Sequence, residues 1–535
     1  MSWKLKAVGV LGFASLLVAV LPAQQDATVT VDAGKTVNVL TNYALGVMMQ
    51  AGDGSLNDPN LAKMLLPAGI RTIRYPDGWD GVADLYHWST YRPNKWENSN
   101  PPKVGYYPPQ NDFGHFALQL DKVGSALITV NYGTNMAGNG GGDPVEAAAW
   151  VAYANGDPAS NSALGKDASG HDWNTVGYWA TMRASAPLTD DDGYNFLRIN
   201  HPAPLHIKLW EVGNQVYNNG YYGDTHGTET DWHAPYPENA KENSKRHHDS
   251  HLSPAAYAAG FKAFAQAMKA VDPSIMVGAS MALPAIDYGF APDWDQDVLK
   301  DACKEIDFVS LQWQPSIGSL PPDWKHMDED QMLSVPENDL SKIMKELLYI
   351  YGKDCPAGHI PKVAFSSLSY PNWQIVDDAQ VSGLFAAHTM ALLTEMGSVN
   401  IDWNEFHQKG LYSDDNKPLP VFYGIQMLHI IAFQPGDLFV GAEIKGNGIV
   451  AHATHRRSGL YGVMLINKDG HSSSRVKVVF NNAKIQAEGI RFDYGGAQAK
   501  ANTGPARSDL KMDGNSVIVT IPPYSMVDIV VPEAK

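Results

Sequence analysis

The sequence predicts an α/β fold, a (β/α)8 TIM barrel followed by a C-terminal all-β sandwich domain. Short apolar runs rich in β-branched residues alternate with helical patterns over residues 37–435, and this alternation is typical of a parallel barrel. After about residue 436 the helical patterns stop, and strand-like pieces separated by turn signals continue to residue 535. A chain of 535 residues is long enough for both domains.

The apolar runs and the helical patterns alternate regularly along the barrel segment. Candidate strands lie at 38–48, 70–74, 127–132, 206–212, 275–279, 308–313, 363–365 and 399–403. Helical patterns fall between them at 61–66, 145–154, 254–270, 340–351 and 380–396. An open, doubly wound sheet is the alternative arrangement. No Gly-x-Gly-x-x-Gly motif opens a helix after the first strand, which favours the barrel.

The C-terminal segment 436–535 has the sequence pattern of a compact β module. Its candidate strands lie at 448–453, 459–467, 475–480, 516–521 and 526–531. The segment 24–36 precedes the barrel, carries a further strand pattern from about residue 28, and is a candidate extra strand of this module.

Residues 1–23 have the pattern of a secretory signal peptide. Lys4 and Lys6 precede an apolar run at 7–21, and a small-residue exit follows at 22–24. The run is short for a membrane-spanning helix, so we expect cleavage near Ala23, a secreted or periplasmic location, and no membrane contact afterwards. A retained membrane anchor is the alternative.

Composition excludes some partners and leaves one question open. The net charge of −17 disfavours nucleic acid and anionic membranes, both of which need a basic surface. Cys303 and Cys355 precede neighbouring predicted strands, so a disulfide at the bottom of the barrel and two free cysteines are both open. Neither belongs to a Cys/His cluster, and the sequence contains no HExxH, P-loop, GxSxG or EF-hand motif, so we expect no metal or cofactor.

The end of the fourth predicted strand carries the most specific motif. Residues 209–215 read Leu-Trp-Glu-Val-Gly-Asn-Gln, and this segment resembles the fourth-strand motif Trp-Glu-x-Gly-Asn-Glu of clan A glycoside hydrolases, most closely the α-L-arabinofuranosidase and β-xylosidase-like members. The resemblance covers most of the mature chain. It includes the segments 74–76, 131–134, 403–407 and 522–525.

The resemblance implies a retaining glycosidase whose two catalytic carboxylates are replaced. Retaining hydrolysis uses a general acid/base and a nucleophile, both carboxyl groups, about 5 Å apart. Gln215 stands at the acid/base position, and its amide can neither donate a useful proton nor accept one near neutral pH. Ser367 stands at the nucleophile position at the end of the seventh strand, where a neutral, shorter side chain is a poor nucleophile without an adjacent base.

The sixth predicted strand departs from the family pattern as well. Its end resembles Ser-x-His-x-Tyr-Pro, but Gln312 and Gln314 take the places of the His and the Tyr that support the nucleophile. Four changed positions on three strands point to one disabled site.

Other positions of the cleft match the family pattern and are expected to bind substrate. They are Arg74, Asn131, Tyr132, Asn214, Trp313, Trp403, Glu405 and His407. We expect Trp313, Trp403 and Tyr132 to line the cleft, together with aromatic residues of the long loop 217–253 (Tyr221, Tyr222, Trp232, His233 and Tyr236). The segment 156–204 is also long and polar.

Four carboxylate residues lie on or near the predicted cleft. Glu211 lies deep in the barrel, since four residues of extended strand separate it from Gln215, and we interpret it as a structural partner of Arg74. Glu405 is the best surviving carboxyl at the top of the barrel, although a hydrogen-bonding role is favoured for it. Asp77 and Asp80 could reach the rim.

Three functions remain in competition. The favoured hypothesis is a catalytically inactive glycosidase scaffold that binds an oligosaccharide or a plant-type polysaccharide fragment. The second is an active α-L-arabinofuranosidase-like enzyme that uses Glu405 or another carboxylate. The third is a structural protein that neither binds sugar nor catalyses its hydrolysis.

Overall fold

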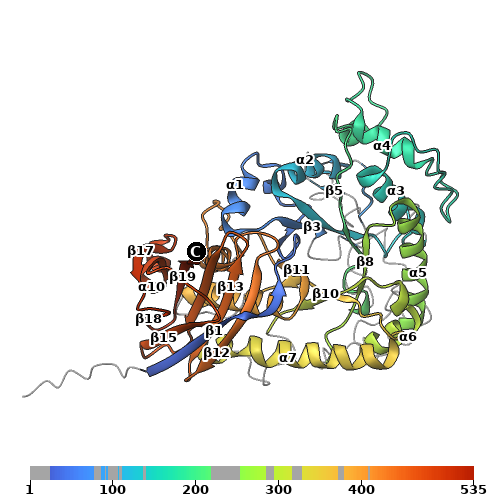
Figure 1. Cartoon of the computed structure of the whole chain (residues 1–535). Coiled ribbons are helices and arrows are strands. Elements are labelled where there is room, and N and C mark those ends of the chain that lie inside the picture. Colours follow the sequence, from blue (N-terminus) through green and yellow to red (C-terminus); the bar gives the residue numbers. More distant parts are fainter. Residues whose placement is uncertain are drawn as a thin grey trace, which may run out of the picture.

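The computed structural model describes two packed bodies, a barrel and a β domain (Figure 1). The described residues are 25–77, 83, 86–90, 92–93, 106–107, 111–136, 140–218, 253–284, 294–315, 328–370, 379–407 and 410–534.

Eight parallel strands close the barrel within this part of the chain. They are β2 (Leu45–Gln50), β3 (Thr72–Asp77), β6 (Ser125–Val130), β7 (Leu209–Val212), β8 (Met276–Ser280), β9 (Phe308–Trp313), β10 (Lys362–Leu368) and β11 (Ser398–Trp403). Their order around the barrel is β10-β11-β2-β3-β6-β7-β8-β9, and β10 pairs with β9 to close the ring. The predicted barrel is confirmed. A further short pair, β4 (Arg92–Pro93) with β5 (Tyr106–Tyr107), lies between β3 and β6 in the chain.

One predicted strand has the wrong bounds. The run 38–48 spans the end of β1 (Gln25–Val39) and the start of β2, with a turn between them. Both strands are apolar on either side of that turn, so hydrophobicity alone joined them.

Helices surround the barrel and alternate with its strands. They are α1 (Leu61–Leu65), α2 (Phe113–Val123), α3 (Pro144–Asn155), α4 (Val176–Ala184), α5 (Pro254–Val271), α6 (Trp294–Ala302), α7 (Glu329–Asp354), α8 (Gln380–Glu395) and α9 (Pro420–Ile431). The described helices include none that combines the length and the hydropathy needed to cross a bilayer.

The segment between α3 and β7 lies against the helix layer. Its helix α4 packs on α3, and Arg183 of α4 donates hydrogen bonds to the carbonyl oxygens of Ala154 (3.1 Å) and Gly156 (3.2 Å) at the end of α3. Trp179 packs edge-on against Trp88, with ring centroids 5.0 Å apart. This long segment therefore supports the outer side of the barrel.

The inside of the barrel is apolar at its lower end. Side chains from five strands form a small separate core there, made of Leu127, Leu209, Phe308, Ala364 and Val399. Because side chains alternate along a strand, the residue two positions further on points inward again, one layer closer to the carboxyl ends. On β6, β7, β9 and β10 the residues of that next layer are polar, and they form the floor of the candidate site: Thr129, Glu211, Ser310 and Ser366.

The C-terminal domain is a curved nine-stranded sheet in the described chain. Its order is β17-β16-β19-β14-β13-β12-β1-β15-β18. The strands beyond β1 are β12 (Leu438–Lys445), β13 (Ile449–Arg456), β14 (Leu460–Asn467), β15 (Ser474–Asn481), β16 (Glu488–Tyr494), β17 (Ala506–Lys511), β18 (Ser516–Ile521) and β19 (Ser525–Pro532), and the short helix α10 (Gly496–Ala501) follows β16. The edge strand β18 contacts β14 and β19, so the sheet curls around its own core and nearly closes. An all-β C-terminal domain is confirmed.

The N-terminal strand belongs to this sheet. β1 pairs antiparallel with β12 and parallel with β15. The chain therefore starts its described part in the β domain, forms the barrel, and returns to complete the same sheet.

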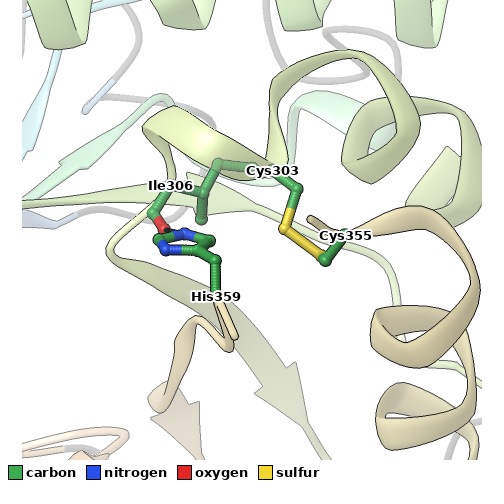
Figure 2. The surroundings of a disulfide bond; sticks show 4 residues. All are labelled: Cys303, Ile306, Cys355 and His359. Atoms are coloured by element: carbon green, nitrogen blue, oxygen red, sulfur yellow. Dashed lines mark hydrogen bonds between the residues drawn. A yellow bond between two sulfur atoms is a disulfide. The ribbon is translucent and has the colours of Figure 1, made fainter. Parts of the chain in front are cut away.

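A disulfide joins Cys303 to Cys355, the pairing that the sequence left open. Cys303 directly follows α6 and Cys355 caps the end of α7, with the two Cα atoms 5.4 Å apart. Figure 2 shows the bond beside His359, whose Nε2 lies 3.0 Å from the carbonyl oxygen of Ile306. The disulfide ties the chain ahead of β9 to the chain ahead of β10, at the lower end of the barrel.

Candidate active site

A buried ion pair forms the floor of the candidate site. Arg74 of β3 and Glu211 of β7 are almost completely buried, and Arg74 Nε donates to Glu211 Oε1 at 2.8 Å. Thr129 donates to the same oxygen at 2.7 Å, and Ser310 donates to Oε2. Donors occupy both carboxylate oxygens, so Glu211 is a structural partner of Arg74 at the floor of the candidate site, as the sequence predicted.

A chain of side-chain amides rises from this floor. Arg74 Nη2 donates to Asn214 Oδ1 at 2.9 Å, and Gln312 Nε2 donates to the same oxygen at 2.6 Å. Gln215 Nε2 in turn donates to Gln312 Oε1 at 2.5 Å. Gln215 has a left-handed backbone conformation, with φ of 50°, directly after Asn214. The structure thus brings together Gln215 and Gln312, two of the positions at which the sequence departs from the family pattern.

The end of β10 presents two consecutive serines. Ser366 Oγ lies 2.7 Å from Ser310 Oγ and donates to it, because the single hydroxyl proton of Ser310 goes to Glu211; Ser366 therefore belongs to the polar floor. The pairing register with β9 shifts between Phe365 and Ser367, and Ser367 lies opposite Gln312. Residues opposite each other in parallel strands share a face, so this irregularity turns Ser367 to the side of the barrel that Gln312 occupies. Asn404, directly after β11, donates to Ser367 Oγ at 3.2 Å.

Glu405 and His407 lie at the top of β11. Gln50 at the end of β2 donates to Glu405 Oε2 at 2.9 Å, and Glu405 is 5 % exposed. His407 Nδ1 lies 2.9 Å from Asp53 Oδ2, and its Nε2 lies 2.8 Å from Asn416 Oδ1. Both ring nitrogens of His407 therefore have partners at the rim. Glu405 therefore lies at the top of the barrel and accepts a hydrogen bond there, which agrees with the position and the hydrogen-bonding role expected from the sequence.

The three aromatic side chains expected to line the cleft point toward the helices instead. Tyr132 packs against Tyr257 and Phe264 of α5, with ring centroids 5.1 and 5.6 Å away. Trp313 stacks on Phe385 of α8 at 6.0 Å, and Trp403 contacts the same ring edge-on at 6.4 Å.

The alternation of side chains explains this correction. Gln312 and Asn404 make their contacts on the inner side, so the adjacent Trp313 and Trp403 face outward. Both indole Nε1 atoms are buried without a hydrogen-bond partner among the described residues. These rings hold α8 against the strands.

Two further predicted positions sit at strand ends. Asn131 accepts from the backbone amide of Thr134 at 3.0 Å and donates to the carbonyl of Tyr86 at 3.4 Å, so it shapes the loop that follows β6. Gln314 is half-buried just after β9.

Several predicted positions lie outside the described residues. These are Asp80, the side chain of Asp77, and the aromatic residues Tyr221, Tyr222, Trp232, His233 and Tyr236.

Sequence reasoning missed Gln50 and Asn404. Both lie at or just after the carboxyl end of a barrel strand, as Gln215 and Ser367 do, and this position was the available signal. In the described chain no group of three or more His, Cys, Asp or Glu residues is arranged to hold a metal ion.

Comparison with solved structures shows which known fold this chain shares. No profile of a known protein family and no curated protein matches the sequence. Solved structures do match. The α-L-arabinofuranosidase from Thermotoga maritima, in its arabinose complex, is 16 % identical with a TM-score of 0.65 and aligns over 95 % of this chain and 100 % of its own.

Two other structures illustrate the range of the fold. The family 51 arabinofuranosidase from Xanthomonas axonopodis pv. citri is 15 % identical with a TM-score of 0.64, and the family 44 endoglucanase from Clostridium thermocellum is 14 % identical with a TM-score of 0.60. Both alignments cover 95 % of this chain and 100 % of the other. The chain therefore shares the fold of these family 51 arabinofuranosidases, barrel and β domain together.

Proposed function

We propose that this protein binds an oligosaccharide at the carboxyl end of its barrel and does not catalyse retaining hydrolysis. The proposal rests chiefly on the contact between Gln215 and Gln312, where an amide takes the place of the acid/base carboxyl. An amide held by a second amide has no acidic proton for a leaving glycosidic oxygen. It keeps the hydrogen-bonding capacity to contact a sugar hydroxyl.

The remaining groups support the same proposal. Ser367 accepts from Asn404, which is an amide and not a general base that could activate the hydroxyl. Glu211 is engaged by Arg74 and is not free to act as nucleophile or acid. Without a carboxylate at either position, an oxocarbenium-like transition state lacks its main electrostatic stabilisation.

The polar lining supports sugar binding. Amide and hydroxyl groups of Gln215, Gln312, Asn214 and Ser367 converge on one end of the barrel, which is where barrel proteins carry their ligand sites. The fold is shared with arabinofuranosidases, one of them solved with arabinose. We therefore propose arabinose-containing or xylose-containing plant-type fragments as the first ligands to test.

Calorimetry and turnover measured on the same purified protein test the proposal. We expect heat of binding with at least one fragment of an arabinoxylan or arabinan panel, and no release of aryl arabinofuranoside or xyloside. Gln215→Ala should weaken the binding about 2- to 10-fold, the worth of one hydrogen bond. Gln486→Ala, an exposed glutamine of the β domain, is the matched control and should leave binding unchanged.

Glu405 supports the second candidate function, an active enzyme, because it is a carboxylate at the top of the barrel. Turnover by the wild type that disappears in Glu405→Gln would establish this candidate and overturn ours. No binding heat and no thermal stabilisation with any sugar would favour a structural protein.

We also propose that the protein is exported after removal of residues 1–23. The Cys303–Cys355 disulfide supports this location, since such bonds persist in oxidising compartments. N-terminal sequencing of the protein from its native host should find Gln24 as the first residue. An intact Met1 in the native protein would contradict the proposal.

A further inference from the structure

Two buried histidines lie face to face where the barrel meets the β domain. His388 of α8 and His452 of β13 have side chains that are each 3 % exposed, and His388 Nδ1 lies 2.9 Å from His452 Nε2. The rings come from different domains, so their contact is a polar bond across the junction.

A carboxylate stands at each end of the pair. His452 Nδ1 lies 2.9 Å from Oε1 of Glu395, at the end of α8. His388 Nε2 lies 3.3 Å from Oε1 of Glu337 on α7. Lys468, just after β14, donates to the same Glu337 oxygen at 2.7 Å. These five residues, called the junction cluster below, join α7 and α8 of the barrel to β13 and the end of β14.

The cluster needs one proton more than two neutral rings can supply. Its three contacts, carboxylate to imidazole, imidazole to imidazole, and imidazole to carboxylate, each need one N–H. Two neutral imidazoles carry only two N–H groups between them. In the neutral state, therefore, one of the three contacts has no proton and brings two acceptors together, either a ring lone pair and a carboxylate or the lone pairs of both rings.

The geometry indicates which contact lacks the proton. The contacts at His388 Nδ1 and at His452 Nδ1 are hydrogen bonds of 2.9 Å. His388 Nε2 is buried without an aligned hydrogen bond in the described chain, although Glu337 is within ion-pair distance. The open position is thus His388 Nε2.

Charge balance favours filling this position. With neutral rings, two carboxylates and one ammonium leave the cluster with one negative charge, whereas one added proton makes it neutral. Burial raises the pKa of the Glu337 carboxyl, but His388 and Lys468 outweigh burial and hold that pKa at about 2. An added proton therefore stays on the imidazole, where Glu337 can accept its hydrogen bond.

We propose that the junction cluster is a single-proton clasp, in which acidification adds one proton at His388 Nε2 and closes its hydrogen bond to Glu337. The proton then links α7 through both rings to α8 and β13. Burial lowers the pKa of His388, the Glu337 carboxylate opposes that effect, and His452 and Lys468 add to it, so the clasp closes below neutral pH. Tyr524, which donates to Asp330 at 2.7 Å, holds α7 to the β domain at a second point in either state.

Hydrogen exchange at imidazole C2, followed by mass spectrometry, measures this titration in the intact protein. His388 is the one histidine of the segment Gln380–Glu395, so its peptide reports on it alone. We expect a single proton uptake at His388, with its midpoint below the ordinary pKa of a histidine because burial lowers the pKa of this ring. Amide exchange of the 329–337 peptide should slow over the pH range of this uptake, after correction for intrinsic rates.

Two variants test the proposal with opposite signs. Glu337→Gln should lower the His388 midpoint by about 1 to 3 pH units, because it removes the acceptor charge. Lys468→Gln should raise the midpoint, because it removes a positive charge from the same cluster. Separate proton uptake by each of the two rings, or a His388 midpoint that neither variant moves, would overturn the clasp.

Discussion

Replacing Glu211 by Gln should destabilise the barrel far more than its small change in shape implies. The carboxylate receives hydrogen bonds from Arg74, Thr129 and Ser310, and both partners of the ion pair are about 1 % exposed. Glu211→Gln keeps the size of the side chain but leaves the Arg74 guanidinium buried without a counter-charge. Removing one partner of such a pair costs about 3–5 kcal/mol.

The measurement is urea unfolding followed by tryptophan fluorescence, since Trp210 is adjacent in the same strand. Asp192→Asn is the matched control, because Asp192 pairs with Arg198 at the surface, where such a pair contributes about 1 kcal/mol or less. The double variant Arg74→Met with Glu211→Leu should cost less than the two single changes added together. A loss in Glu211→Gln as small as that in Asp192→Asn would refute the structural role of Glu211.

Two other predictions concern stability. The Cys303–Cys355 disulfide closes a segment of 52 residues, so Cys303→Ser with Cys355→Ser should lower the free energy of unfolding by up to about 4 kcal/mol, and an unchanged urea midpoint would contradict its contribution. Burial raises the pKa of Asp295 to about 8, with a backbone N–H from Ala282 acting against it. The folded protein therefore keeps a proton that the unfolded chain releases above about pH 4, and Asp295 contributes stability that is lost as pH rises toward 8. Between pH 5 and pH 8 the free energy of unfolding should fall less in Asp295→Asn than in the wild type. An equal fall in both proteins would count against the raised pKa of Asp295.

The sequence predicted the barrel because its strands are short, apolar and separated by helical patterns. The sixth strand was predicted with the bounds that β9 has, 308–313, because polar residues flank an apolar core on both sides. The sequence patterns did not predict helices α2 and α9, both of which are largely buried in the structure. A helix that is apolar on most of its surface, as α9 is, shows little periodicity.

The candidate site was predictable in its composition but not in its geometry. Gln215 and Gln312 follow from their places at strand ends, and the structure brings them into contact. The inward direction of Ser367 depends on a register shift within β10, and no pattern in the sequence predicts that shift. For the same reason the outward direction of Trp313 and Trp403 could not be assigned, since it depends on which neighbour faces the barrel axis.

The most direct test of the proposed function is to restore the two carboxylates together. The variant Gln215→Glu with Ser367→Glu is assayed on aryl arabinofuranosides and xylosides, with binding of the matching sugar measured by calorimetry on the same samples. We predict that the wild type binds the sugar without hydrolysing it and that the double variant hydrolyses it at least about 100-fold faster than the wild type. Hydrolysis by the wild type would contradict the proposal that Gln215 and Ser367 make this site inactive. A double variant that binds the sugar as tightly as the wild type does and remains inactive would contradict it as well.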